Sequence, residues 1–180
     1  PARFRGFPSV ASRLALVAAG EGDVVPMLAF PLPALVIDAQ DAEARGRALY
    51  GAWLCGAVLG NVGMALQHKL CHTLGGTYNL PHAETHTVVL PHALAYNAPA
   101  VPEAIDRIAR ALGVGDAARG MFDLAASLGA PTALKDIGMP EGQLDWCAEI
   151  ATQNAYANPR PIEKAAIRAL LEDAYHGKRP

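Results

Sequence analysis

A cluster of histidines carries the strongest chemical signal in this sequence. Five of the six histidines fall between residues 68 and 92, namely His68, His72, His82, His86 and His92. His68 and His72 are four residues apart, so on a helix they share one face, about one turn apart. His82 and His86 repeat this spacing. Because imidazole titrates near neutral pH and is a common metal ligand, the cluster predicts proton transfer or metal binding.

The pattern does not match a known zinc motif. The His-Glu-x-x-His order of metalloproteases is absent, because Lys69 follows His68 and Glu84 stands two residues after His82. The alternative is a set of core or interface histidines that bond to backbone carbonyls. Five histidines so close together are harder to explain in this way than a single one, and both interpretations stay open.

Other polar residues around the cluster are weaker candidates. Glu84 could orient a histidine, but a first-turn acid that complements the helix dipole is the favoured reading. Cys71 could bind a metal, although a small packing role is favoured. Lys69 and Arg160 could receive a carboxylated substrate, although most such cations are only solvated.

Helical periodicity dominates the rest of the chain. Asp41 is the expected N-cap of the first clear helix, and no long stretch alternates with a period of two, so we expect an all-α, bundle-like domain. Trp53 and Trp146 fall in these helical patterns and are predicted to be core. After the first helix, the expected segments are about 62–74, 81–96, 102–112, 116–128, a short turn at 132–137, 141–154 and 161–175.

Glycines and prolines predict where these helices are interrupted. Gly75 and Gly76 are expected to end the second helix and to allow a tight reversal that brings the two histidine pairs together. Pro91 predicts a kink or break in the third helix. Gly113 and Gly177 are expected to end later helices.

Three further glycines fall in or beside the first two expected helices. Gly56, Gly60 and Gly63 lower helix propensity by about 1 kcal/mol each relative to alanine. The expected compensation is the close approach of a neighbouring helix or a ligand.

Residues 1–31 differ from the rest. Only a short helix at 12–19 and an extended piece at 24–30 are suggested there, among several prolines. We therefore leave 1–31 unassigned and place one helical domain at 32–180, which the family resemblance described below makes the metal- or substrate-side domain. Pro1 in place of an initiator Met suggests a fragment or a processed product.

Composition excludes several classes of function. Hydrophobic residues make up 52%, charged residues 18%, and the net charge is −2, which predicts a folded chain without a nucleic-acid or anionic-membrane partner. No apolar run reaches the length of about 20 residues that spans a bilayer. Three separated cysteines argue against a disulfide framework and fit a cytoplasmic protein.

Several motifs closely resemble the maleylacetate reductases of the iron-containing alcohol dehydrogenase group. They are GAWLCG at 51–56, GMALQHKLCHTLGG at 63–76 and LPHAETHTVVLPHALAYN at 80–97. The resemblance continues through DIGMP at 136–140 and NPRP at 158–161, and it covers about residues 32–180.

The resemblance implies one half of a two-domain enzyme. An N-terminal α/β domain of the family binds NADH or NADPH, but no glycine-rich phosphate-binding motif occurs in this chain. The helical domain faces it across the active-site cleft. By motif position, His68 and His82 correspond to two metal ligands for Fe²⁺ or Zn²⁺, while the other two ligands lie on a helix outside this chain. His72 corresponds to the histidine beside the nicotinamide and the substrate, a proton donor or relay.

The implied reaction is the reduction of maleylacetate, a small dicarboxylate, to 3-oxoadipate during the breakdown of aromatic compounds, by a full-length homodimer. One alternative is a metal-dependent alcohol dehydrogenase of the same family, although Lys69 and Cys71 favour the reductase. Another is an inert helical domain. The choice between NADH and NADPH, and the presence of a metal, depend on residues outside this chain.

Overall fold

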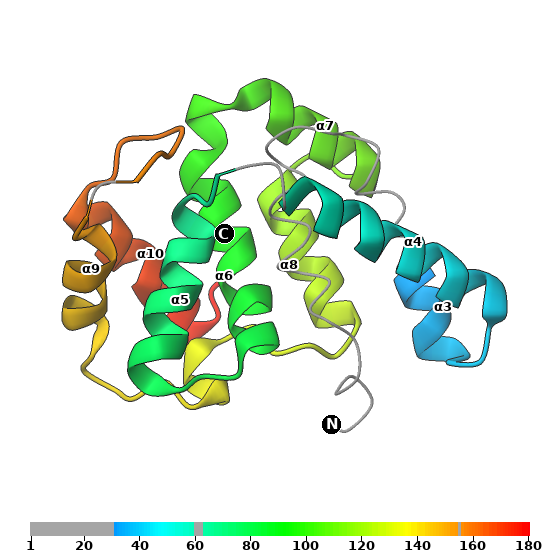
Figure 1. Ribbon diagram of the computed structural model, residues 1–180, viewed down its shortest axis with the longest axis horizontal. Helices are drawn as coiled ribbons and strands as arrows, with labels where there is room; N and C mark the ends of the chain where they lie inside the picture. The colour runs from blue at the N-terminus through cyan, green and yellow to red at the C-terminus, as the bar shows by residue number, and fades with distance from the viewer. Residues whose placement is uncertain (1–30, 60–62, 155) are drawn as a thin grey trace.

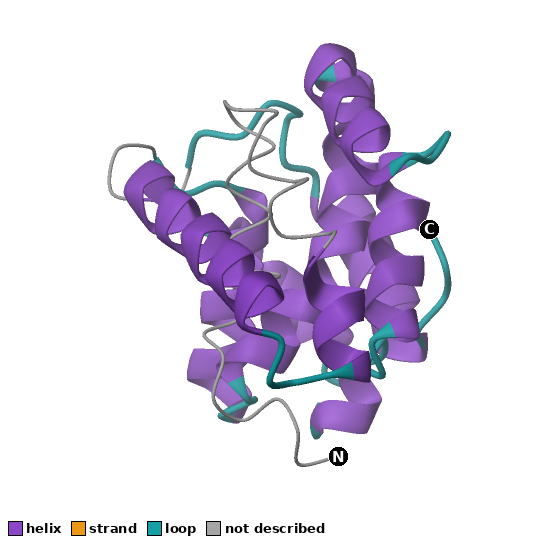
Figure 2. Ribbon diagram, turned by 90° about the vertical axis from the view of Figure 1, so that its right-hand side faces the viewer, coloured by secondary structure: helices purple, strands orange, loops and turns teal. Residues whose placement is uncertain are grey.

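A computed structural model describes residues 31–59, 63–154 and 156–180. Within these ranges every regular element is a helix (Figures 1 and 2), which confirms the expected all-α class. No helix in the described ranges is both long and apolar enough to span a membrane. The elements are α3 (Pro31–Ile37), α4 (Ala42–Leu59), α5 (Leu66–Tyr78), α6 (His82–Asn97), η1 (Ala98–Ala100), α7 (Pro102–Leu112), α8 (Ala117–Ser127), η2 (Leu134–Ile137), α9 (Leu144–Thr152) and α10 (Lys164–His176).

Helix α6 lies at the centre of the molecule (Figure 1) and packs against α5, α8 and α10. From Thr85 to Tyr96 nearly every side chain of α6 is buried. A helix that is apolar all round is stable only when neighbours cover every face. Helices α5, α8 and α10 supply most of this cover.

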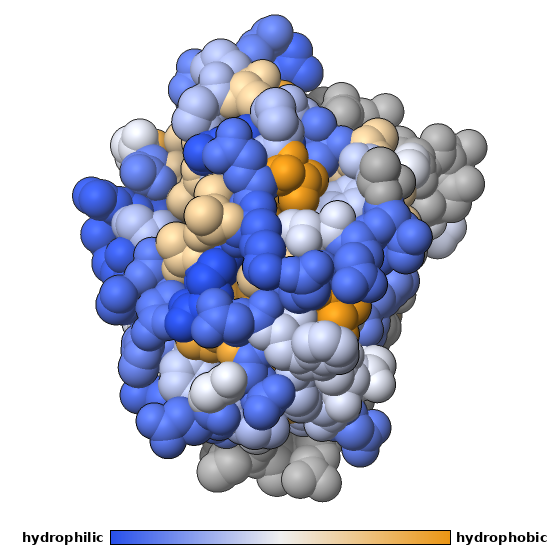
Figure 3. All heavy atoms as spheres, turned by 90° about the vertical axis from the view of Figure 1, so that its left-hand side faces the viewer, coloured by the Kyte–Doolittle hydropathy of each residue, from blue (hydrophilic) through white to orange (hydrophobic). Residues whose placement is uncertain are grey.

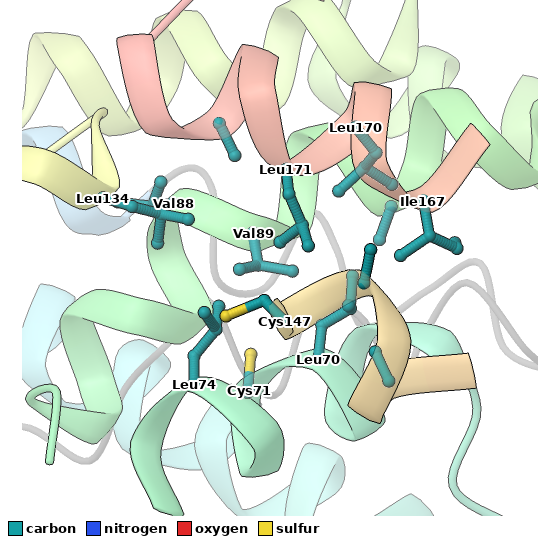
Figure 4. Close-up of a cluster of buried hydrophobic side chains, with 14 of the residues drawn as sticks. Leu70, Cys71, Leu74, Val88, Val89, Leu134, Cys147, Ile167, Leu170 and Leu171 are labelled. Atoms are coloured by element: carbon teal, nitrogen blue, oxygen red, sulfur yellow. The ribbon is translucent and has the colours of Figure 1, made fainter. Parts of the chain in front are cut away.

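Two hydrophobic clusters meet on α6. Val88 and Val89 face the larger cluster, which α5, α9 and α10 complete with side chains such as Leu74 and Leu171 (Figure 4). Leu90 faces the smaller cluster, which is formed with α4, α7 and α8. Burying one leucine side chain contributes about 2 kcal/mol, so these clusters supply most of the driving force for the fold.

Local capping signals predict several helix ends correctly. The Asp41 carboxylate accepts hydrogen bonds from the backbone N–H of Glu43 and Ala44 at 3.0 Å and so starts α4. Asp116 caps α8 in the same way. Gly113 and Gly177 end α7 and α10 with positive φ angles of 69° and 68°, as expected.

The predicted end of the second helix is wrong. Helix α5 continues through Gly75 and Gly76 to Tyr78, and Asn79 ends it with a φ of 53°. The two glycines together cost about 2 kcal/mol of helix propensity, but the burial of Leu66, Leu70 and Leu74 of the same helix outweighs this cost. The reversal that joins α5 to α6 therefore lies at residues 79–81.

Pro91 does not interrupt the third helix. Helix α6 runs unbroken from His82 to Asn97, so the predicted break is wrong. Proline removes one helical hydrogen bond, the one that the carbonyl of Thr87 would accept. Pro91 is itself buried, and packing on all sides of α6 holds the helix together.

No neighbouring helix among the described residues approaches Gly56 or Gly63 closely. A Cβ atom built on either glycine meets nothing within 4 Å there, so the expected neighbouring helix is wrong for both, while the alternative of a ligand stays a prediction. Gly60 lies outside the described residues, as do the segments 12–19 and 24–30. Helix α3, which the sequence did not predict, packs only along α4 among the main contacts of the described chain.

Both tryptophans are exposed, contrary to the prediction that they are core. Trp53 on α4 is 63% exposed and stacks on Tyr50 with ring centroids 5.8 Å apart. Trp146 on α9 is 53% exposed. Helical spacing identified the helices correctly, but in both cases the tryptophan lies on the outward face.

Helices α9 and α10 present a mostly hydrophilic face (Figure 3). Ion pairs join the two helices there, between Arg168 and Asp145 at 3.0 Å and between Lys164 and Glu149. Exposed pairs of this kind contribute only about 0–1 kcal/mol each. The apolar side chains beneath them, not these charges, hold α10 in place.

The side chain of Asn158 joins three separate segments. Its amide N–H groups donate to Asn97 Oδ1 at 2.8 Å and to the carbonyl of Arg160 at 2.7 Å. Its Oδ1 accepts from the first N–H of α5, on Leu66, at 3.3 Å. This one amide thus fixes the start of α5 relative to the end of α6.

We expect Asn158→Ala to lower the free energy of unfolding by about 2 kcal/mol, because it removes several partly buried hydrogen bonds at once. Urea unfolding followed by circular dichroism measures the change. The exposed amide variant Gln40→Ala is the control and should change stability by less than about 0.5 kcal/mol. Equal effects of the two variants would show that Asn158 does not connect the helices.

Candidate active site

Four histidines form a closed ring across the α5–α6 hairpin. His68 and His72 lie on α5, and His82 and His86 lie on α6. Neighbouring ring centroids are 6.0 Å apart for His68–His72, 6.4 Å for His72–His82, 4.3 Å for His82–His86 and 4.9 Å for His86–His68. The predicted meeting of the two histidine pairs is therefore confirmed, although the reversal lies later than expected.

The four rings differ in exposure. His72 and His82 are exposed. His68 is 7% exposed, and His86 is fully buried at 0%. A substrate or cofactor that docks on the hairpin can therefore touch His72 and His82 directly, while His86 can act only through its neighbours.

Gln67 is a partner of this ring that the sequence analysis missed. Its side-chain Nε2 lies 2.9 Å from Nδ1 of His86, 3.4 Å from the carbonyl oxygen of His86 and 3.5 Å from Sγ of Cys71. Gln67 is only 7% exposed. Glutamine is usually a surface residue, so nothing in the sequence singled out this one.

Burial governs the protonation of the two inner rings. Burial, together with smaller effects of the nearby His82, His68 and His72 rings, lowers the pKa of His86 from 6.5 to about 3. Burial also lowers the pKa of His68, with smaller contributions from His72 and His82. Both inner rings are therefore neutral at neutral pH.

The described side chains do not by themselves form a metal site. No group of three or more His, Cys, Asp or Glu side chains in these parts of the chain is placed to hold a metal ion. His68 and His82 supply two nitrogen ligands at most, and a tetrahedral site needs four ligands in all. Their assignment as ligands for Fe²⁺ or Zn²⁺ therefore stays a prediction that depends on residues elsewhere.

The two candidate substrate cations occupy different places. Lys69 is half-buried beside His68, with its Nζ 5.9 Å from the centroid of the Tyr156 ring. The Arg160 guanidinium donates to the backbone carbonyl of Tyr96 at 3.2 Å, and its Cζ lies 4.3 Å from the centroid of the Tyr96 ring. Tyr96 is about 21 Å along α6 from His82. Through these contacts Arg160 packs against the C-terminal end of α6.

Cys71 and Glu84 lie where the favoured interpretations expect them, in the core and in the first turn of a helix. Cys71 is fully buried in the main hydrophobic cluster, and burial raises the pKa of its thiol well above the usual value. Glu84 lies in the first turn of α6, where a carboxylate complements the helix dipole.

His92, the fifth histidine, does not belong to the ring. It lies on α6 beyond Pro91, is 4% exposed, and its Nε2 is buried without a hydrogen-bond partner among the described residues. Burial lowers its pKa to about 4, against a smaller opposite effect of Asp173. His92 is therefore a core histidine, as the structural interpretation expects, but its Nε2 does not make the expected bond to a backbone carbonyl among the described residues.

Comparison with known proteins agrees with the fold and the histidine spacing. The profile of the Fe-containing alcohol dehydrogenase family, C-terminal part, matches residues 18–175. The chain therefore belongs to the iron-containing alcohol dehydrogenase family. The match begins inside the segment 1–31 that the sequence analysis left unassigned, and the boundary at residue 32 stays a prediction.

Within this family the chain is similar to maleylacetate reductases. It is 62% identical to the one from Burkholderia cepacia over 78% of this chain and 40% of that protein. It is 56% identical to the one from Rhizobium sp. strain MTP-10005 over 83% of this chain and 42% of that protein. The chain thus spans about two fifths of the length of these relatives.

Solved structures show the same relationship. A putative alcohol dehydrogenase from Ralstonia eutropha JMP134 superimposes with a TM-score of 0.89 at 56% identity, over 94% of this chain and 52% of that one. The maleylacetate reductase from Rhizobium sp. strain MTP-10005 gives a TM-score of 0.86 at 49% identity, over 94% and 51%. An iron-containing alcohol dehydrogenase from Corynebacterium glutamicum gives 0.83 at 39% identity, over 92% and 46%.

The buried state of His92 predicts a dependence of stability on acid. Its pKa is about 4 in the folded chain and 6.5 when unfolded, so the unfolded state binds more protons between these values. This part of the free energy of unfolding is present above pH 6.5, and about 3 kcal/mol of it is lost as the pH falls to 4. Urea unfolding of wild type and His92→Leu across this range measures it.

We expect the wild type to lose more stability between pH 6.5 and 4 than His92→Leu does. The matched control is His176→Leu, because His176 is exposed. Parallel pH profiles of wild type and His92→Leu would contradict a neutral, buried His92.

Proposed function

We propose that this chain is the substrate-side helical domain of an enzyme that reduces maleylacetate to 3-oxoadipate with NADH or NADPH. The observation that carries the proposal is the identity of 50–62% to several maleylacetate reductases over most of the chain. The histidine ring, with two rings open to a docking substrate, supports it. We also expect a cytoplasmic, homodimeric full-length enzyme.

The reaction needs a hydride at one carbon of an activated double bond and a proton at the neighbouring carbon. The nicotinamide supplies the hydride. His72 is exposed on the hairpin, and we assign to it the proton transfer and the contact with the nicotinamide. Histidine suits this task because its two nitrogens can hold and release a proton near neutral pH.

Negative charge develops on the ketone oxygen of the substrate when the hydride arrives. A preorganised N–H donor stabilises such an enolate. His82 is the second exposed ring, and its centroid lies 6.4 Å from that of His72, so one small substrate can reach both. We therefore assign the polarisation of the oxygen to His82, with Lys69 as a candidate for a substrate carboxylate.

A second reaction of the same family is the alternative. The likeness to an iron-containing alcohol dehydrogenase from Corynebacterium glutamicum favours it. That reading requires a metal held by His68 and His82 together with ligands outside the described residues. Oxidation of simple alcohols that depends on added Fe²⁺ or Zn²⁺ would distinguish it.

The test is NADH or NADPH oxidation at saturating maleylacetate by the natural protein that contains this chain. We expect His72→Ala to lower kcat by at least about 100-fold, the usual contribution of general acid catalysis. His176→Ala is the matched control, because His176 lies on α10 and is bound to Glu172 at 2.9 Å.

Two outcomes would contradict the proposal. Turnover of alcohols but not of maleylacetate would favour the alcohol dehydrogenase. A folded protein that oxidises neither nicotinamide would favour an inert helical domain.

A further inference from the structure

Gln67 and His86 form a buried pair at the base of the histidine ring to which the proposed reaction assigns no role. Gln67 is 7% exposed and His86 is 0% exposed, and their side chains are joined at 2.9 Å. Two of their polar atoms, Oε1 of Gln67 and Nε2 of His86, are buried without a hydrogen-bond partner among the described residues. Buried polar atoms of this kind are uncommon and ask for an explanation.

The surroundings of Gln67 fix the direction of its amide. Its Nε2 faces the carbonyl oxygen of His86 at 3.4 Å and Sγ of Cys71 at 3.5 Å, as well as the His86 ring. A carbonyl oxygen is only an acceptor. If the amide were reversed, its own oxygen would face this carbonyl, and both would be repelled. Gln67 therefore donates its N–H groups at this end.

The direction of the amide sets the tautomer of His86. Because Gln67 donates to Nδ1, this nitrogen must carry a lone pair, so the ring is neutral and its one proton is on Nε2. A ring with its proton on Nε2 and its Nδ1 occupied is a hydrogen-bond donor to its remaining neighbours. It offers no free lone pair to a metal ion.

The neighbours of the His86 ring are the rings of His82 and His68. Their centroids lie 4.3 Å and 4.9 Å from that of His86, both edge to face. His82 is the nearer of the two and is exposed, whereas His68 is buried. His86 Nε2 has no hydrogen-bond partner among the described residues, so the bond from this N–H to His82 is part of the inference.

We propose that Gln67 and His86 are positioning residues that form a one-way hydrogen-bond chain, from the Gln67 amide through His86 to His82. In this chain His82 accepts at one nitrogen, so its own proton must sit on the other nitrogen. The chain presents that N–H of His82 to an oxygen of the bound substrate. The inference rests on the proposed function only for the identity of this substrate.

The consequence is that His82 serves as a neutral donor and not as a base. Such a donor stabilises an oxygen that gains negative charge, as the ketone oxygen does during reduction. No proton is transferred along the chain, so no atom or charge is left unbalanced. The proton that reaches carbon comes from His72, which lies outside the chain.

Gln67→Glu tests the direction of the chain, because a carboxylate of nearly the same shape can only accept. It should move the His86 proton from Nε2 to Nδ1 and leave His82 without its inner donor. Imidazole ¹⁵N NMR of protein labelled at histidine reads the tautomer of each ring directly. We expect the Nε2–H tautomer of His86 in the wild type and the Nδ1–H tautomer in the variant.

Kinetics provide the second measurement. We expect Gln67→Glu to lower kcat for maleylacetate by about 100-fold, the usual loss for one oxyanion donor, with KM changed less than about threefold. The matched control is Gln143→Glu, the same substitution at a half-buried amide outside the ring that accepts from Tyr78 at 3.3 Å. It should leave both the tautomers and kcat unchanged.

Gln67→Met is a second variant, to be used if the buried carboxylate of Gln67→Glu prevents folding. It removes the bond without reversing it, so His86 should show a mixture of tautomers. An Nδ1–H tautomer of His86 in the wild type, or an unchanged tautomer in both Gln67 variants, would overturn the inference. If the wild type does not turn over maleylacetate, the proposed function fails, while the NMR result still decides the inference.

Discussion

The burial of α6 on every side is the constraint on which the structure depends. From Thr85 to Tyr96 nearly all of its side chains are covered by neighbours such as α5, α8 and α10, and its first turn reaches the surface. A helix of this kind has no stable arrangement without its neighbours. The same constraint locates the candidate site, because His82 is exposed at the start of α6 and His86, one turn later, is already buried.

This position produces a site with an outer and an inner layer. The outer rings, His72 and His82, are open to a substrate. The inner rings, His68 and His86, are held neutral by burial, which lowers their pKa values. The four rings therefore differ in depth, and only the two outer rings can touch a molecule that docks on the hairpin.

The sequence alone predicted the features that depend on interactions between residues close together in the chain. Asp41 and Gly113 act through hydrogen bonds and backbone angles within one turn of the helix ends, so their roles could be read directly. The helix pattern and the motif match also identified the all-α class and the family correctly. The spacing of four residues was enough to predict that two histidine pairs share helix faces.

The errors concern features that packing decides. Gly75 and Pro91 lie inside continuous helices because the core outweighs their local cost. The exposed Trp53 could not be told from a core residue without its neighbours. His92 lies in the same histidine-rich stretch but outside the two pairs, and only its burial shows that it is a core residue. Gln67 was missed because only a folded chain shows that it is buried against His86.

We propose that the substrate meets the two exposed rings of the histidine ring, His72 and His82. Imidazole ¹⁵N NMR of the natural protein, titrated with the product 3-oxoadipate, tests this proposal. We expect the His72 and His82 signals to shift on binding, while those of His92 and His176 do not. Binding that leaves His72 and His82 unchanged would contradict it.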